Sequence, residues 1–136
     1  MSRFKLEALV AVVLSAAACN KTTTPIAPTV TPPVSVTDTF AGTLSKNGAT
    51  NFQFSVSSAG SVFATFSSVA DPSTVVGLSL GTWNGTTCAV ILANDQAAHG
   101  TTVTGLVTGI GTLCTRVYDV GKVVDPLDSQ GTVVHP

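Results

Sequence analysis

The sequence has few charged and few aromatic residues. Charged side chains make up 10% of the 136 residues and aromatic side chains 6%, with one Trp and one Tyr. Setting Arg3, Lys5 and Glu7 aside leaves four of the six basic residues and six of the seven acidic ones, a balance of −2. No basic cluster remains, so nucleic acid is excluded as an expected partner. Strong helix formers are also scarce after residue 20, and no amphipathic helix is expected there.

The first 18 residues have the three parts of a secretory signal peptide. Arg3 and Lys5 give a positive start, an apolar run covers Ala8–Ala18, and small residues stand at its end. A membrane-spanning helix needs about 20 apolar residues, and this run is shorter because Lys5 and Glu7 precede it. Residues 1–18 are therefore predicted to direct export.

Cys19 follows this run directly, in the order Leu14-Ser15-Ala16-Ala17-Ala18-Cys19. This order resembles the lipobox of bacterial lipoproteins, although Ala16 stands where that family usually has Leu. The resemblance implies that Cys19 is lipidated and becomes the first residue of the mature chain. Several acyl chains on one residue hold a protein firmly on a membrane. Asn20 in place of Asp implies the outer membrane. The alternative is an ordinary signal peptide cut near Ala18.

Residues 19–37 are rich in Thr and Pro. Their four prolines, Pro25, Pro28, Pro32 and Pro33, are incompatible with a continuous helix or ladder. Such a stretch favours an extended polyproline II conformation, with a reach of roughly 50 Å at about 3.1 Å per residue. The stretch is predicted to be a disordered tether that holds the following domain away from the bilayer.

Residues 38–136 are predicted to form one all-β domain. Short segments of alternating apolar and polar residues recur with turn residues between them, which is typical of a sandwich or barrel. About eight strands are expected, and two antiparallel sheets would bury their apolar faces in a jelly-roll or Greek-key arrangement. The expected strands are 39–45, 49–57, one around 62–66, one around 76–80, 86–92, 101–108, 113–120 and a short last strand at 132–135.

Two Asn-Gly pairs predict tight hairpins. Asn47-Gly48 and Asn84-Gly85 supply the residue types that type I′ turns require. The stretch from Asn94 to Gly100 is polar and is predicted to be a loop.

Three segments resemble the pre-peptidase C-terminal domains of bacterial secreted proteins. They are Gly42-Thr43-Leu44, the stretch from Asn51-Phe52-Gln53-Phe54 to Ala59-Gly60-Ser61-Val62, and Gly111-Thr112-Leu113-Cys114-Thr115-Arg116-Val117-Tyr118-Asp119. The resemblance covers roughly residues 37–136 and implies a small, noncatalytic, jelly-roll-like sandwich. It also implies that Asp119 bonds the backbone of a neighbouring loop. Asp128-Ser129-Gln130-Gly131 departs from the family's usual last strand, so that strand is expected to be weak.

Cys88 and Cys114 remain once Cys19 carries lipid. Two cysteines in an exported domain are expected to pair. Cys114 shares the alternation of Arg116 and Tyr118, so the bridge is predicted on the outer face of the sandwich or near an edge. Free thiols or metal ligands are the alternatives.

Catalysis, a metal and a cofactor are not predicted. A nucleophilic triad needs a histidine base beside an acid, and the two histidines are His99 in a loop and His135 at the end. Asp119, Asp125 and Asp128 cluster near the C-terminus, and a calcium site there stays open although no regularly spaced acidic run is present.

Glycan binding is the most specific function that the residues suggest. Trp83 beside Asn84-Gly85, and Tyr118 beside Arg116, are candidate ligand-facing residues. The alternation of β residues places Trp83 opposite the apolar face unless a bulge at Gly81 reverses it. The alternative for Trp83 is a lid over the core.

The sequence therefore predicts a noncatalytic, monomeric lipoprotein of the cell envelope, anchored in the outer membrane through Cys19. Its role is predicted to be surface binding, adhesion or structural support, with a polysaccharide or an envelope protein as partner. A glycan-binding domain and an accessory domain of a secreted peptidase system are the two alternatives.

Overall fold

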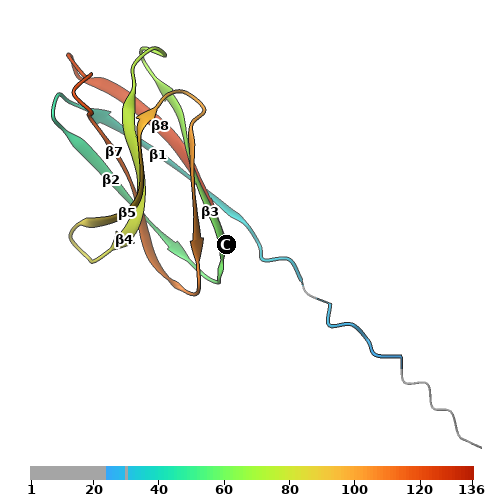
Figure 1. The fold of residues 1–136 in the computed structure, drawn as a ribbon. Helices are drawn as coiled ribbons and strands as arrows, with labels where there is room; N and C mark the ends of the chain where they lie inside the picture. The colour runs from blue at the N-terminus through green and yellow to red at the C-terminus, as the bar shows by residue number, and fades with distance from the viewer. Residues whose placement is uncertain (1–23, 30) are drawn as a thin grey trace, which may run out of the picture. The chain divides into compact units, whose positions relative to one another are not determined.

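The computed structural model describes residues 24–29 and 31–136, and its regular structure is entirely β. Eight strands form two antiparallel sheets of four, which confirms the predicted β-sandwich (Figure 1). The strands are β1 (Val36–Leu44), β2 (Ala49–Val56), β3 (Gly60–Val69), β4 (Val76–Trp83), β5 (Cys88–Ala97), β6 (Thr102–Val107), β7 (Gly111–Tyr118) and β8 (Leu127–His135).

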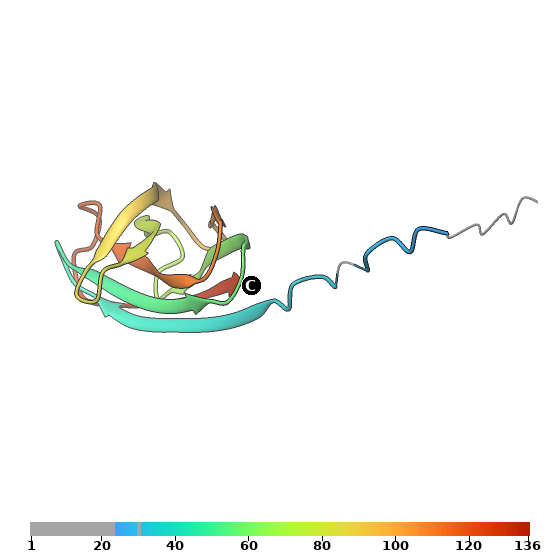
Figure 2. The same ribbon diagram turned by 90° about the horizontal axis from the view of Figure 1, so that it is seen from below.

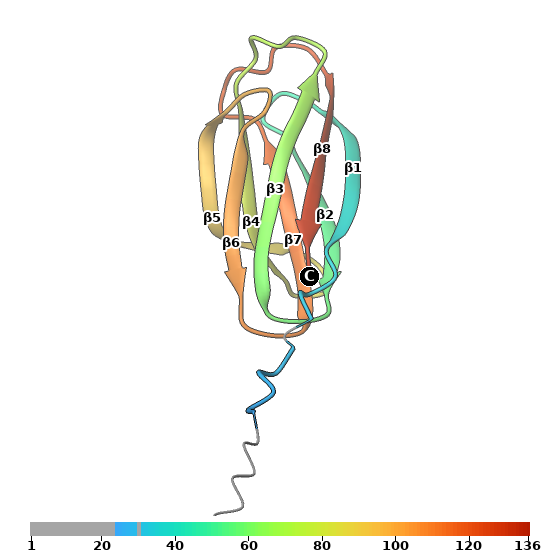
Figure 3. The same ribbon diagram turned by 90° about the vertical axis from the view of Figure 1, so that its right-hand side faces the viewer.

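The strand order is that of a jelly roll. One sheet, called sheet A here, has the order β1-β8-β3-β6, and the other, sheet B, has the order β2-β7-β4-β5. Figure 3 shows β6, β3, β8 and β1 side by side in front of the other layer, and Figure 2 shows the sandwich from its end. Most strands that follow one another in sequence thus lie in different sheets. β4 and β5 are the consecutive strands that lie in the same sheet and pair as a hairpin.

The core lies between the two sheets and follows the period-two alternation of the strands. In β3, Val62, Ala64 and Phe66 are buried, and in β4, Val76 and Leu78 are buried. The other buried core residues are Phe40, Leu44, Phe54, Val56, Leu80, Ala97, Val103, Val117, Val123 and Val133. The Phe40 and Phe52 rings, 4.9 Å apart between centroids, join the sheets where β1 faces β2.

The first Asn-Gly prediction is wrong. Ser45–Gly48 forms a turn closed by the Gly48 N–H donating to the Ser45 carbonyl, and only Asn47 takes a positive φ, of 56°. A type I′ turn needs a positive φ at both central residues. The strands on either side, β1 and β2, belong to different sheets and are not paired. The second prediction is correct for the hairpin, because Asn84 and Gly85 lie in the turn between paired strands β4 and β5. The turn is not of type I′, since only Gly85 has a positive φ and the loop spans four residues, 84–87.

Several strand boundaries also differ from the predictions, among them the start of β1, the end of β5 and the start of β8. β1 begins at Val36 rather than at 39. β5 continues to Ala97 through the stretch predicted as a loop, because two bulges place an extra residue on β5 and disguise its alternation. β8 begins at Leu127 rather than at 132, and its polar stretch pairs with both β1 and β3.

Gly131 explains why the polar stretch of β8 forms a central strand. A Cβ at this position would lie 2.1 Å from the Phe40 ring and 2.5 Å from the Thr65 carbonyl oxygen. Ser129, also buried, donates a hydrogen bond of 3.1 Å to the Gly42 carbonyl. The stretch is therefore packed tightly, contrary to the expectation of a weak last strand.

Residues 24–29 and 31–35 have no helix or strand and are exposed. The predicted leader and Cys19 lie outside the described residues. In the part of the chain that is described, no helix has the length and apolar character needed to cross a bilayer.

Candidate functional site

The outer face of sheet B collects the candidate ligand-facing residues. Tyr118, Arg116 and Cys114 of β7 pair with Gly77, Ser79 and Gly81 of β4, respectively. Their neighbours in β7, Thr115 and Val117, point into the sandwich and are fully buried. Alternation therefore places Tyr118, Arg116 and Cys114 together on the side of the sheet that faces away from the core.

Gly77 lets the Tyr118 ring lie against the backbone of β4. A Cβ at Gly77 would come within 2.1–2.5 Å of three ring carbons of Tyr118. The phenol thus occupies the space that a side chain at position 77 would need. Its hydroxyl donates a hydrogen bond to Oδ1 of Asp95 in β5. The ring therefore extends from β7 across β4 to β5 and is fixed at both ends.

The environment of Tyr118 favours its neutral form. Partial burial, followed by the hydrogen bond to Asp95 and the charge of that carboxylate, raises the pKa of Tyr118 to about 12. The Arg116 guanidinium opposes this shift, and its carbon lies 5.6 Å from the centre of the ring in a cation–π contact. The hydroxyl consequently stays a hydrogen-bond donor across the physiological pH range.

Arg116 is the neighbouring cation on this face. Its Nε is shielded from solvent and has no hydrogen-bond partner among the described residues. Among the described residues, no carboxylate lies within ion-pair distance of Arg116, so its charge is not neutralised there. On the other side of β7, Asn51 of β2 pairs with Arg116 and is exposed.

A hollow of about 650 Å³ opens at the Tyr118 end of sheet B. It is lined by Val75, Asp95, Gln96, Tyr118, Asp119, Val120 and Lys122. Its volume falls within the range of about 300–1,000 Å³ that is usual for ligand sites. One aromatic ring, two carboxylates, an amide and an ammonium therefore surround the same space.

Asp119 holds the loop that forms one wall of this hollow. Its Oδ1 accepts hydrogen bonds from the N–H groups of Gly121, Lys122 and Val123, and its Oδ2 accepts one from Asn47. These bonds, that from Asn47 foremost, lower the pKa of Asp119 to about 2. The predicted role of Asp119 as a partner of loop backbone is thus seen directly, and both its oxygens are occupied.

The disulfide between Cys88 and Cys114 is present and lies on the same face. It connects β5 to β7, although β4 lies between these strands. At Gly81 a Cβ would lie only 2.1 Å from the Ala89 carbonyl oxygen, so the start of β5 passes over β4 where there is no side chain. This crossing brings the two Cα atoms to 5.8 Å. The sequence prediction of an outer-face bridge agrees with this placement.

Trp83 continues the outer-face alternation of β4 and is half-buried. The register shift beside Gly81 places the extra residue on β5, at Ile91, so the alternation of β4 is not reversed. Trp83 pairs with Cys88, so along β4 the disulfide lies between Trp83 and the position of Tyr118. Gly77 and Trp83 are six residues apart on β4, or about 20 Å at ~3.3 Å per residue. The structure therefore puts Trp83 and Tyr118 on one face but does not bring them together.

The two histidines occupy different environments. His99 is exposed in the β5–β6 loop. His135 is buried, with its Nε2 3.0 Å from Oδ2 of Asp38 and its Nδ1 3.2 Å from the Pro136 carbonyl oxygen. Its ring packs on Phe54, with 5.1 Å between centroids. Both ring nitrogens of His135 therefore contact oxygens of the protein itself, and this side chain fastens the end of β8 to β1.

Two of the acidic residues considered for calcium already accept hydrogen bonds from other parts of the protein. Asp119 is used by the loop, and Asp128 accepts a hydrogen bond of 3.0 Å from the Thr43 hydroxyl. Among the residues that the structure describes, no group of three or more His, Cys, Asp or Glu is arranged to hold a metal ion.

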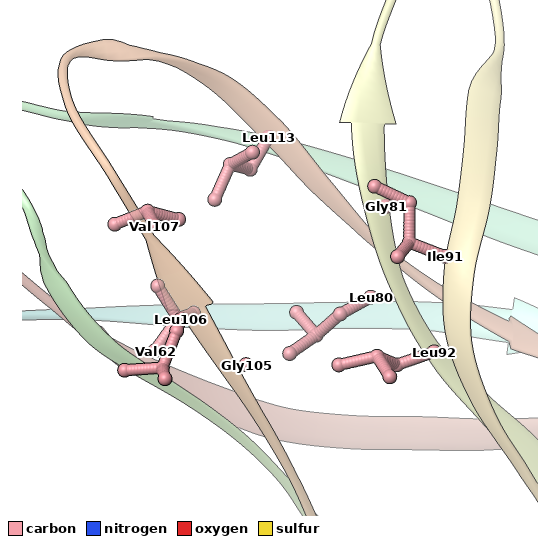
Figure 4. A pocket seen from close by; sticks show the side chains of 9 residues that line it. All are labelled: Val62, Leu80, Gly81, Ile91, Leu92, Gly105, Leu106, Val107 and Leu113. Atoms are coloured by element: carbon pink, nitrogen blue, oxygen red, sulfur yellow. The ribbon is translucent and has the colours of Figure 1, made fainter.

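A second, smaller hollow of about 70 Å³ lies where β5 faces β6 (Figure 4). Its walls are entirely apolar or glycine: Val62, Leu80, Gly81, Ile91, Leu92, Gly105, Leu106, Val107 and Leu113. Leu106 and Ile91 are exposed at its rim, at 82% and 67%. It lacks the polar side chains that orient a specific ligand.

Gly77, Asp95, Gln96 and Lys122 are site residues that the sequence did not reveal. Asp95 lies in the stretch that the sequence predicts to be a loop, and its position opposite Tyr118 depends on the bulges of β5. Gly77 directly precedes the apolar Leu78 and carries no local signal beyond being a glycine within a strand, which often marks a close approach of another group.

No protein-family model and no curated protein matches this chain. The resemblance to pre-peptidase C-terminal domains consequently depends on the sequence segments quoted above.

Proposed function

We propose that the chain is a noncatalytic, monomeric module of the bacterial cell envelope, anchored in the outer membrane by lipid on Cys19. The pattern that carries this proposal is the apolar run ending at Cys19, followed by an exposed, proline-containing stretch and then a compact sandwich. Among the described residues, every strand lies after residue 35, and so does the disulfide. Such an arrangement suits a domain displayed at a distance from a membrane.

Lipidation at Cys19 is tested with a single substitution. The full chain and its Cys19→Ala variant are expressed in a Gram-negative bacterium supplied with radioactive palmitate. The parent chain is expected to incorporate label and to sediment with outer membranes, and the variant is expected to do neither. Mass spectrometry of the extracted parent identifies the acylated residue. An unlabelled parent chain that retains Met1 would refute the proposal.

Binding of a polysaccharide is the more specific form of this function. The outer face of sheet B supports it, because an immobilised tyrosine ring, an arginine without an ion-pair partner in the described chain and an open polar hollow lie together there. Aromatic faces and hydrogen-bonding groups around one cavity are what a ligand with both apolar and hydroxylated faces requires. Co-sedimentation of the purified chain with insoluble polysaccharides tests this candidate at the level of the whole protein.

A further inference from the structure

We infer that the hollow at Tyr118 binds one uncharged sugar ring of a polysaccharide, with the phenol as the aromatic part of its wall. The inference rests on the polysaccharide-binding candidate above and assigns it to one place in the fold. The hollow is bounded by the ends of β5 and β7 and by the loop after β7.

Tyr118 is already fixed in one position before any ligand arrives. Gly77 accommodates the ring on β4, Asp95 holds its hydroxyl, and the Arg116 guanidinium lies over the ring in a cation–π contact. A rigid aromatic side chain loses little conformational entropy on binding, so more of the contact energy is retained as affinity. Where the ring lines the hollow it offers an apolar surface that the C–H groups of a sugar ring can contact.

The groups around the ring can serve hydroxyls as donors and acceptors. Gln96 and Lys122 are exposed and line the hollow. Asp95 accepts from Tyr118 through Oδ1, and its Oδ2 accepts no hydrogen bond from the described residues. Hydroxyl groups both donate and accept, which matches an amide, an ammonium and a free carboxylate oxygen in one hollow.

The charges of the site favour an uncharged ligand. Asp95 and Asp119 face the hollow together with Lys122, and Arg116 lies next to Tyr118. Two carboxylates against two cations leave no net charge. A carboxylated polysaccharide would bring further negative charge close to Asp95 and Asp119, and like charges at short range are unfavourable. An apolar ligand would leave these polar groups without partners.

Native affinity electrophoresis of the full chain in detergent tests the inference. Gels contain a neutral β-glucan, xylan or glycol chitin, and an alginate gel represents a charged polysaccharide. At least one neutral polysaccharide is expected to retard the parent protein. Tyr118→Ala is expected to weaken that binding about tenfold, the size of one lost aromatic contact. Phe63→Ala is the matched control, because Phe63 is an exposed aromatic residue of sheet A, 40% exposed, and is expected to bind as the parent does.

A second variant avoids the folding risk of changing Tyr118. Gln96→Ala combined with Lys122→Ala alters only exposed side chains and is expected to weaken binding while the circular dichroism spectrum and disulfide stay unchanged. Retardation of the parent that neither variant reduces would overturn the assignment to this hollow. Retardation by alginate alone would overturn the choice of an uncharged sugar. A parent that no gel retards would remove polysaccharide binding altogether, whereas the palmitate experiment judges the lipid anchor separately.

Discussion

Removal of the disulfide should cost the sandwich a large part of its stability. The Cys88–Cys114 bridge closes a loop with a sequence separation of 26. For a loop of this size, the chain-entropy relation gives about 3.5 kcal/mol of stabilisation at 25 °C, through restriction of the unfolded chain. Small domains have a total stability of roughly 5–15 kcal/mol, so the bridge supplies between a quarter and more than half of it.

The perturbation is the double substitution Cys88→Ala and Cys114→Ala. The parent and the variant are both produced from residue 20 onward, so that neither protein carries the Cys19 thiol. Urea unfolding followed by Trp83 fluorescence is expected to show a free energy of unfolding lower by about 3–4 kcal/mol. The melting temperature should fall by about 15–25 °C, given the size of the domain. The slope of free energy against urea should rise, because the unfolded chain without a bridge exposes more surface.

Reduction of the parent protein provides the control for packing. Cys114 is fully buried, so its replacement removes a packed sulfur as well as the bridge. Dithiothreitol breaks the bridge and leaves both sulfurs in place, and the reduced parent should lose nearly as much stability as the variant. A loss below about 1 kcal/mol in both proteins would refute the argument from loop closure.

Three further outcomes follow from single side chains. Gly81→Ala should destabilise the sandwich by about 1–3 kcal/mol in urea, because its Cβ would meet the backbone of β5, whereas Gly105→Ala, with neighbours at 3.5 Å, should be tolerated. Phenolate absorbance of Tyr118 should titrate near pH 12, and Asp95→Asn should lower that midpoint only by the share due to Asp95, because burial is the largest cause of the raised pKa and remains. Because the pKa of Tyr118 is higher in the folded than in the unfolded protein, the contribution of its protonated hydroxyl to stability is full below pH 10 and is lost between pH 10 and 12. A titration midpoint that Asp95→Asn leaves unchanged would contradict the Tyr118–Asp95 contact. For Asp119 the folded pKa is the lower one, so its contribution is present above about pH 4 and is lost toward pH 2. Melting temperatures should therefore fall across that window in the parent, and fall less in Asp119→Asn.

Much of the fold was predictable because β structure repeats every two residues. Val62, Ala64 and Phe66 recur at every second position, and this spacing predicts a strand with the three side chains on one face, which the structure shows to be buried. The same reasoning placed Cys114 on one face with Arg116 and Tyr118. The prediction weakened where β5 bulges, because an extra residue shifts the alternation and makes the end of the strand read as a loop.

The sequence alone thus determined that the chain forms a two-layer β structure and that Cys114, Arg116 and Tyr118 share a face. It could not determine that β4 lies between β5 and β7, since strand order depends on contacts between residues distant in the chain. That order puts Gly77 beneath Tyr118 and brings Asp95 to its hydroxyl. Tertiary structure decided the site for this physical reason: a glycine provides space only for whatever the neighbouring strands place above it.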